Sequence, residues 1–146
     1  MYSYNFRSLC TDLLEEGRNR LSLTMGIVSH IEKEDYEIVA VSSNAGVFVA
    51  GESFALKDTY CRDVYKQKKT IAITEIDGHP GLQHHPLYMA LALEAYIGSP
   101  IFVDGQVWGT LNFSCMQIRD KPFTDEEIQF NENATKIISR AIIDKI

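Results

Sequence analysis

The sequence has few cysteines, a deficit of basic residues and no long apolar run. Its three cysteines, Cys10, Cys61 and Cys115, are an odd number and lie far apart, so they do not form a disulfide framework. The 14 lysines and arginines are outnumbered by 20 acidic residues, which leaves a net charge of −6. This balance argues against nucleic acid and anionic membranes as partners, because phosphate contacts require clustered cations. No apolar run approaches the roughly 20 residues that cross a bilayer.

Several recognisable signals are also missing. The first residues lack the basic segment and the apolar stretch of a signal peptide, and together with the cysteine count this favours a cytoplasmic protein. The chain contains no phosphate-binding glycine loop, no H-E-x-x-H and no G-x-S-x-G pattern. The sequence therefore does not predict a familiar catalytic centre.

The length and the apolar content predict one domain spanning residues 1–146. With 45% hydrophobic residues, a chain of this length buries a sufficient core without a disulfide or a metal. Apolar residues recur at helical spacing at both ends and predict terminal helices over about residues 3–21 and 124–145. The second of these opens on a capping box formed by Thr124 and Glu127.

The middle of the chain alternates between strand and turn patterns. Residues 25–31 and 36–42 predict one hairpin, and residues 95–103 and 106–116 predict another around Asp104 and Gly105. A short strand over 70–74, short helices over 58–68 and 86–92 and a loop over 77–85 complete the order. We expect an α+β fold: an antiparallel sheet of five to six strands with the terminal helices on one face and short helices plus loops on the other.

Four segments of the chain resemble GAF sensory domains, as found in bacterial sensor kinases and cyclic-di-GMP enzymes. They read FALKDTYC at 54–61, EAYIGSPI at 94–101, VWGTLNF at 107–113 and PFTDE at 122–126. The resemblance extends from about residue 9 to residue 143. It implies a GAF/PAS-like sheet, a ligand pocket between the sheet and the middle helices, and terminal helices that dimerise and carry a signal to an output domain.

The strand after Gly105 presents two different faces, because alternate side chains point in opposite directions. One face is wholly apolar and suits packing on the terminal helices. The other mixes an aromatic ring with polar groups, as small-molecule pockets do. The alternative is a face that is merely covered by a helix. The ligand-site residues predicted on this sheet are Trp108, Thr110, Asn112 and Ser114, with Tyr96 from the neighbouring strand.

The predicted start of the 58–68 helix supplies four more candidate ligand-binding residues. Asp58 or Thr59 is expected to cap the helix, and helix N-termini attract anions through unpaired N–H groups. Tyr60 and Cys61 follow in the first turn, where a helix start would lower the pKa of a thiol and make it redox-sensitive. The alternative, which we favour because buried cysteines are common, is a simple cap followed by a buried, small apolar cysteine.

The histidines do not predict a metal site. His79, His84 and His85 fall in the breaker-rich loop, and His30 lies in an early strand. A metal needs three or four converging ligands, and adjacent histidines point in different directions in most backbones. We expect no metal and surface histidines instead.

Two subtypes of the resembled family can be compared with this chain residue by residue. Bilin-binding members attach their chromophore through a cysteine near the helix before the strand at Tyr96, but residues 82–90 contain none, so a covalent bilin is not expected. Free methionine sulfoxide reductases use a nucleophilic cysteine in the same region. Cys61 matches another cysteine of that enzyme, but no thiol stands near Met89. We therefore expect a protein that is not an enzyme.

The leading prediction is a cytoplasmic sensory domain that binds an unidentified small molecule. It would act on an attached or partner effector, such as a histidine kinase of a two-component system or a cyclic-di-GMP enzyme. The ligand would stabilise one packing of loop 76–86 and the middle helices, and the terminal helices of a homodimer would carry the change. Two alternatives stay open. One is a thiol enzyme that uses Cys61, and the other is a dimerisation module without a ligand.

Overall fold

The computed structural model describes residues 2–43, 46, 48–77 and 92–145. Six strands form one sheet in which every neighbouring pair is antiparallel. In chain order the elements are α1 (Tyr4–Leu21), β1 (Met25–Glu32), β2 (Asp35–Ser43), β3 (Ser53–Ala55), the 3-10 helix η1 (Leu56–Asp58), α2 (Cys61–Gln67), β4 (Ile71–Ile73), β5 (Ala95–Val103), β6 (Gln106–Cys115) and α4 (Asp125–Ile143). The strand order across the sheet is β3-β2-β1-β6-β5-β4.

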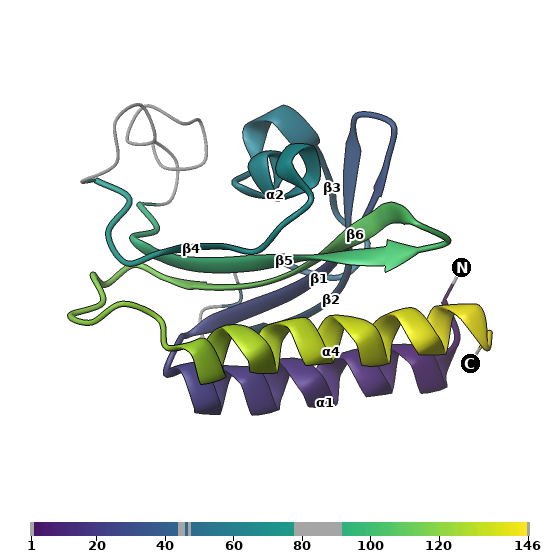
Figure 1. Cartoon of the computed structure of the whole chain (residues 1–146). Coiled ribbons are helices and arrows are strands. Elements are labelled where there is room, and N and C mark those ends of the chain that lie inside the picture. The colour runs from purple at the N-terminus through teal and green to yellow at the C-terminus, as the bar shows by residue number, and fades with distance from the viewer. Residues whose placement is uncertain (1, 44–45, 47, 78–91, 146) are drawn as a thin grey trace.

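The helices cover the two faces of the sheet unequally. Figure 1 shows α1 and α4 side by side beneath the sheet, while α2 lies above it. The predicted α+β architecture, with the terminal helices together on one face, is confirmed. Within the described ranges, no helix combines the length and the apolar character needed to span a membrane.

Local sequence signals explain where the long helices begin. The Ser3 hydroxyl accepts a hydrogen bond from the backbone N–H of Phe6 at 3.0 Å and caps α1. Thr124 and Glu127 cap α4 reciprocally, with distances of 3.1 and 2.9 Å between their side-chain oxygens and each other's backbone nitrogen. The predicted capping box is confirmed.

The second hairpin also follows from its sequence. Asp104 and Gly105 join β5 to β6 with φ angles of 54° and 78°. A two-residue turn with positive φ at both positions matches the right-handed twist of the strands, and aspartate and glycine adopt it more readily than most residues.

The sheet separates two apolar cores. On the helix side, Phe113 of β6 is fully buried against α1, and a Cβ atom at Gly17 would lie 2.2 Å from its ring. This glycine therefore allows α1 to approach the sheet closely. On the other side, Ile38, Val64 and Tyr96 belong to a second core beneath α2.

The middle of the chain departs from the prediction in three ways. Strand β3, which was not predicted, pairs with the start of β2. The expected cap at Asp58 or Thr59 is wrong: the Thr59 hydroxyl donates to the carbonyl of Leu56 at 3.0 Å, and Tyr60 precedes α2 without a side-chain cap bond. A 3-10 turn intervenes and shortens the helix. Most of the predicted 77–85 loop and 86–92 helix lies outside the described residues.

Candidate functional site

A small hollow of about 60 Å³ lies between the sheet and the segment that contains η1 and the start of α2. Five strands and this segment contribute to its wall, which is mostly apolar with several hydroxyl groups. The described lining residues are Met25, Ile27, Tyr36, Ile38, Phe48, Phe54, Asp58, Thr59, Tyr60, Cys61, Leu93, Tyr96, Asn112 and Ser114.

Most residues predicted for the ligand site converge on this hollow, although they come from three separate parts of the sequence. Their role in binding stays a prediction. Thr110 is not in the lining and lies one layer behind it, where its hydroxyl donates to the Cys61 sulfur at 3.2 Å. The predicted residues in the lining are Asp58, Thr59, Tyr60, Cys61, Tyr96, Asn112 and Ser114.

The predicted position of Trp108 is wrong. The pairing of β5 with β6 shifts between Ile101 and Phe102, and Trp108 is the residue of β6 left without a partner. Such a bulge reverses the alternation of side chains. Trp108 therefore packs on the terminal-helix side, where its ring stacks on His30 with centroids 4.3 Å apart and meets the edge of Phe6.

The buried Cys61 thiol is the centre of a hydrogen-bond network at the base of the hollow. Thr110 Oγ1 and Asn112 Nδ2 both donate to its sulfur at 3.2 Å, and the Tyr96 hydroxyl lies at 3.2 Å. The thiol itself donates to the Tyr36 hydroxyl over a long 3.9 Å. Four side chains from three strands thus surround one sulfur atom.

A further layer holds these donors in place. The second N–H of Asn112 donates to the Tyr36 hydroxyl at 3.2 Å. Ser29 Oγ lies 2.7 Å from Thr110 Oγ1 and accepts from the Thr110 backbone N–H at 3.1 Å. Because the single hydroxyl proton of Thr110 is donated to the Cys61 sulfur, the Ser29 hydroxyl must donate to Thr110 Oγ1. The direction of the hydrogen bonds from Ser29 through Thr110 to Cys61 is therefore fixed.

The network is uncharged at neutral pH. Burial raises the pKa of the Cys61 thiol, and the hydrogen bonds from Thr110 and its neighbours only partly oppose this effect. Burial also raises the pKa of Tyr36 and of Tyr96 well above the usual value for a phenol. Of the two interpretations of Cys61, the buried cysteine agrees with the structure and the thiol of lowered pKa does not, because loss of hydration outweighs the position of the thiol at a helix start.

One polar group in the wall of the hollow has no partner. The Ser114 hydroxyl is 1% exposed and makes no hydrogen bond within the described part of the chain. A buried hydroxyl without a partner costs about 1–3 kcal/mol, and a bound molecule that supplies one recovers this energy. Ser114 thus presents an unsatisfied hydroxyl in the wall of the hollow.

The volume of the hollow limits what it holds in this conformation. Pockets for drug-sized ligands measure about 300–1,000 Å³, whereas a single water requires about 10–15 Å³. The observed 60 Å³ accommodates a few waters or a compact molecule of a few heavy atoms.

Several lining residues were missed at the sequence level. Tyr36 and Ile38 alternate with the less buried Asp35 and Glu37, and this period-two pattern was a usable signal for the face of β2. Phe48 comes from the loop before β3, where the sequence carries no periodic signal.

The described residues contain no group of three or more metal-ligating side chains. His30 is held instead by the Trp108 ring and by the Tyr2 hydroxyl, which lies 3.0 Å from its Nδ1. The other three histidines, His79, His84 and His85, lie outside the described residues.

Comparison with known structures identifies the same fold in signalling proteins. The GAF domain of a phosphoenolpyruvate-protein phosphotransferase (ptsP) from Coxiella burnetii has a TM-score of 0.79 at 16% identity, covering 97% of this chain and 84% of that one. The phycocyanobilin-bound GAF domain of a cyanobacterial phytochrome has a TM-score of 0.78 at 16% identity, with coverages of 96% and 85%. The PixJ GAF domain of Thermosynechococcus elongatus has a TM-score of 0.73 at 20% identity, with coverages of 95% and 88%.

At these identities the structural likeness shows a shared fold and no shared ligand. Comparison with curated protein sequences gives no significant match. The GAF domain family, in contrast, matches residues 5–142, which is almost the whole chain. The protein therefore belongs to the GAF domain family.

Proposed function

We propose that this GAF domain is a sensory module that binds a small molecule in the hollow beneath α2 and passes the bound state to an effector. One observation carries the proposal. The hollow combines apolar walls with the buried Ser114 hydroxyl, which has no partner among the described residues. Sites that bind small molecules have this character, with a few polar groups in a mostly apolar wall.

The ligand is expected to be small and uncharged. The described lining contains no lysine, arginine or histidine, and its carboxylate, Asp58, is exposed at the edge. Burying an ion without an opposite charge is costly, so the wall selects against anions. A bilin is much larger than the hollow, so neither covalent nor non-covalent bilin binding is expected here.

Strand β6 offers a direct route from the hollow to the terminal helices. Asn112 faces the hollow, while its neighbour Phe113 packs on α1 beside Gly17. The carbonyl of Leu111 accepts a hydrogen bond from Asn131 of α4 at 3.3 Å. A ligand that prefers one position of β6 therefore also favours one position of both helices, by its difference in affinity for the two states.

The proposal extends to a homodimer and an effector. Ile137 and Ile143 of α4 are 48% and 50% exposed, and exposed isoleucines on a long helix suit a helix-to-helix contact. We propose that the terminal helices dimerise in the cytoplasm and act on a histidine kinase or a cyclic-di-GMP enzyme. Light scattering of the wild type against Ile137→Glu tests the dimer, and a wild type that is monomeric at high concentration contradicts it.

We also propose that the domain is not an enzyme. The thiolate is the nucleophilic form of cysteine, and burial raises the pKa of Cys61. Turnover of free methionine sulfoxide in the wild type that vanishes in Cys61→Ser would overturn this part of the proposal.

Isothermal titration of the protein with uncharged small amides, alcohols and amino-acid amides tests the ligand site. A molecule that binds through Ser114 is expected to lose affinity in Ser114→Ala and to keep it in Ser53→Ala, which makes the same change on an exposed edge strand. The proposal fails if no member of the panel binds, or if both variants bind as the wild type does.

A further inference from the structure

Asn112 carries a second unsatisfied polar group in the wall of the hollow, two residues before Ser114 on β6. Both of its side-chain N–H bonds are used, because one donates to the Cys61 sulfur and the other to the Tyr36 hydroxyl, each at 3.2 Å. Asn112 is only 4% exposed, yet no described residue donates to its carbonyl oxygen, Oδ1. The two donated bonds orient the amide and leave Oδ1 available as an acceptor.

Ser114 supplies a donor to the same hollow. Its hydroxyl is 1% exposed and has no partner among the described residues. A hydroxyl carries one proton to donate and also accepts hydrogen bonds. One strand therefore offers an acceptor at Asn112 and a donor at Ser114, both in the wall of the hollow.

The two groups stand side by side on the sheet. Residues two apart on an antiparallel strand lie about 6.8 Å apart and point to the same face. Their partners on β1, Met25 and Ile27, line the hollow as well, so this stretch of β6 keeps a regular register. A molecule that satisfies both groups must carry a donor and an acceptor next to each other along one edge.

A carboxamide has this pattern. In a primary amide one N–H points in the same direction as the C=O, and bonds of about 1.23 and 1.33 Å place the oxygen and the nitrogen about 2.2 Å apart. With a hydrogen bond of about 2.9 Å at each atom, one edge of the amide reaches both groups. A ketone lacks the donor, and a carboxylate lacks the donor and adds a charge.

The rest of the hollow suits the apolar end of such a molecule. Met25, Ile27 and Ile38 contribute hydrocarbon surface to the wall. The volume of about 60 Å³ limits the ligand to a few heavy atoms. A methyl or ethyl group attached to the amide therefore matches both the size and the character of the remaining space.

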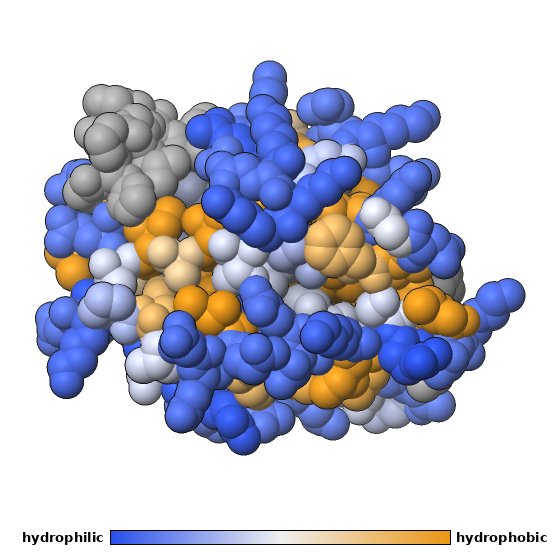
Figure 2. Space-filling view, in the orientation of Figure 1, coloured by the Kyte–Doolittle hydropathy of each residue, from blue (hydrophilic) through white to orange (hydrophobic). Residues whose placement is uncertain are grey.

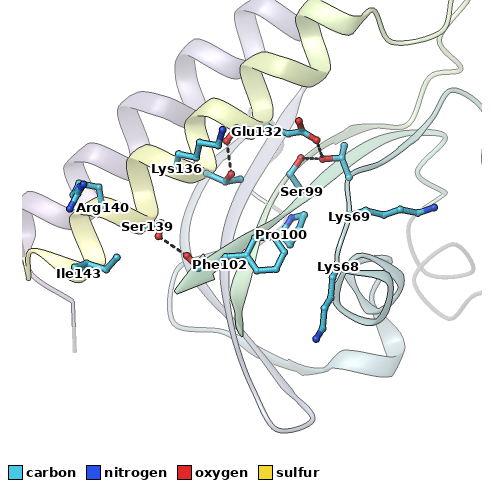
Figure 3. A pocket seen from close by; sticks show the side chains of 12 residues that line it. Lys68, Lys69, Ser99, Pro100, Phe102, Glu132, Lys136, Ser139, Arg140 and Ile143 are labelled. Carbon is cyan, nitrogen blue, oxygen red and sulfur yellow. Dashed lines mark hydrogen bonds between the residues drawn. The ribbon is translucent and has the colours of Figure 1, made fainter. Parts of the chain in front are cut away.

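A larger groove of about 510 Å³ lies outside the domain between α4 and the β5 edge, but its hydroxyl groups already have partners. Ser139 Oγ donates to the Phe102 carbonyl at 2.5 Å, and Thr70 Oγ1 donates to Glu132 Oε2 at 2.7 Å, as Figure 3 shows. In Figure 2 a band of more hydrophobic surface crosses the middle of the molecule between hydrophilic regions. The groove lacks the buried, unsatisfied hydroxyl that characterises the hollow.

We propose that the hollow recognises a compact primary carboxamide, whose N–H donates to Asn112 Oδ1 and whose carbonyl accepts from the Ser114 hydroxyl. This inference rests on the proposed function of the hollow as a ligand site and names the chemical class of its ligand. Because the same Asn112 amide donates to Cys61 and Tyr36, a bound carboxamide joins the thiol network directly.

Three probes of four heavy atoms each separate the parts of the proposal, with the backbone amide signals of β6 followed by NMR of the ¹⁵N-labelled protein. Acetamide is expected to bind in the millimolar range, since so few atoms supply limited affinity. Acetone has the same shape but no N–H, so it leaves Oδ1 unpaired and is expected to bind about tenfold more weakly. Acetate is expected not to bind at pH 7, because its charge would be buried without a partner.

Variants assign the two hydrogen bonds. Ser114→Ala is expected to weaken acetamide and acetone by a similar factor, because both lose the donor to their carbonyl, and to keep the preference for acetamide. Asn112→Leu is expected to abolish that preference. Ser53→Ala, on an exposed edge strand, is the matched control and is expected to change neither affinity. Circular dichroism checks each fold, and if Asn112→Leu does not fold, the probe ratios in the wild type and in Ser114→Ala decide.

The possible failures are distinguishable from one another. Equal affinity of the wild type for acetamide and acetone overturns the carboxamide class but leaves the hollow as a ligand site. Undiminished binding in Ser114→Ala, or a preference for acetamide that persists in Asn112→Leu, overturns the assigned contacts. If none of the probes shifts a β6 signal, both this inference and the proposed function of the hollow fail.

Discussion

Gly109 stands on β6 where β1 comes closest, next to the threonine that donates to the Cys61 thiol. A Cβ atom at this position would lie 1.8 Å from the carbonyl oxygen of Ser29 and 3.0 Å from the Cα of His30. Because real contacts of a Cβ atom are essentially never shorter than 3.0 Å, Gly109→Ala forces the two strands apart by at least 1.2 Å (3.0 − 1.8). No side chain can move aside to relieve this clash, since both neighbouring atoms belong to the backbone.

The expected loss of stability follows from two contributions. Overpacking in a well-packed interior costs about 1–3 kcal/mol, and the weakened bond from the Thr110 N–H to Ser29 Oγ adds about 1 kcal/mol. We therefore expect Gly109→Ala to lower the free energy of unfolding by about 3 kcal/mol, a large part of the 5–15 kcal/mol typical of a domain.

Urea denaturation followed by circular dichroism measures this change, and Gly105→Ala is the matched control. Gly105 has a φ of 78°, but a Cβ atom at this position would meet no described atom within 4 Å, so its substitution adds backbone strain without a clash. That strain is worth about 1–2 kcal/mol. The reasoning is refuted if Gly109→Ala costs no more than Gly105→Ala.

Three further predictions follow from buried polar groups. Iodoacetamide at about pH 8 is expected to modify Cys61 only after the protein unfolds, and fast labelling of the native protein contradicts this. Because the pKa of Cys61 is raised in the folded state, the stability that its protonated thiol contributes should be complete below roughly pH 8.5 and be lost at higher pH. Burial lowers the pKa of His30, so the stability that the neutral imidazole contributes should be present above about pH 6.5 and be lost as the pH falls through the folded-state pKa. Protonation of His30 should quench the fluorescence of the stacked Trp108 in the same pH range, and His30→Gln should abolish this quenching. Asn131→Ala should cost about 2 kcal/mol in urea denaturation, since it breaks two buried hydrogen bonds, one of them to Ser99; an unchanged midpoint argues against this.

The parts of the fold that depend on neighbours in sequence were predictable. The turn at Asp104 and Gly105 requires positive φ, and the capping box of Thr124 and Glu127 is closed by residues three apart. Helical spacing likewise predicted the amphipathic face of α1. Each of these signals is contained within one short stretch of chain, so tertiary packing did not override it.

The parts that depend on distant contacts were not predictable in this way. Simple alternation assigned Trp108 to the wrong face because a single unpaired residue in β6 is invisible without the register of β5. The sequence left both a reactive and a buried Cys61 open, because the burial that raises its pKa arises from strands far away in sequence. Tyr96 and Asn112 were predicted only to share a face of the sheet, and their meeting at the Cys61 sulfur was not predicted.

Because the hydrogen-bond network around the Cys61 thiol is uncharged, it affects how ligand binding in the hollow would depend on pH. With the Cys61, Tyr36 and Tyr96 protons all retained between roughly pH 6 and 8, an uncharged ligand enters without proton uptake or release at these groups. Its binding heat would then be the same in phosphate and in Tris, and its affinity would be flat across that range. If the proposed ligand site is correct, the domain would report how much of a compound is present and would not respond to changes in the acidity of its surroundings.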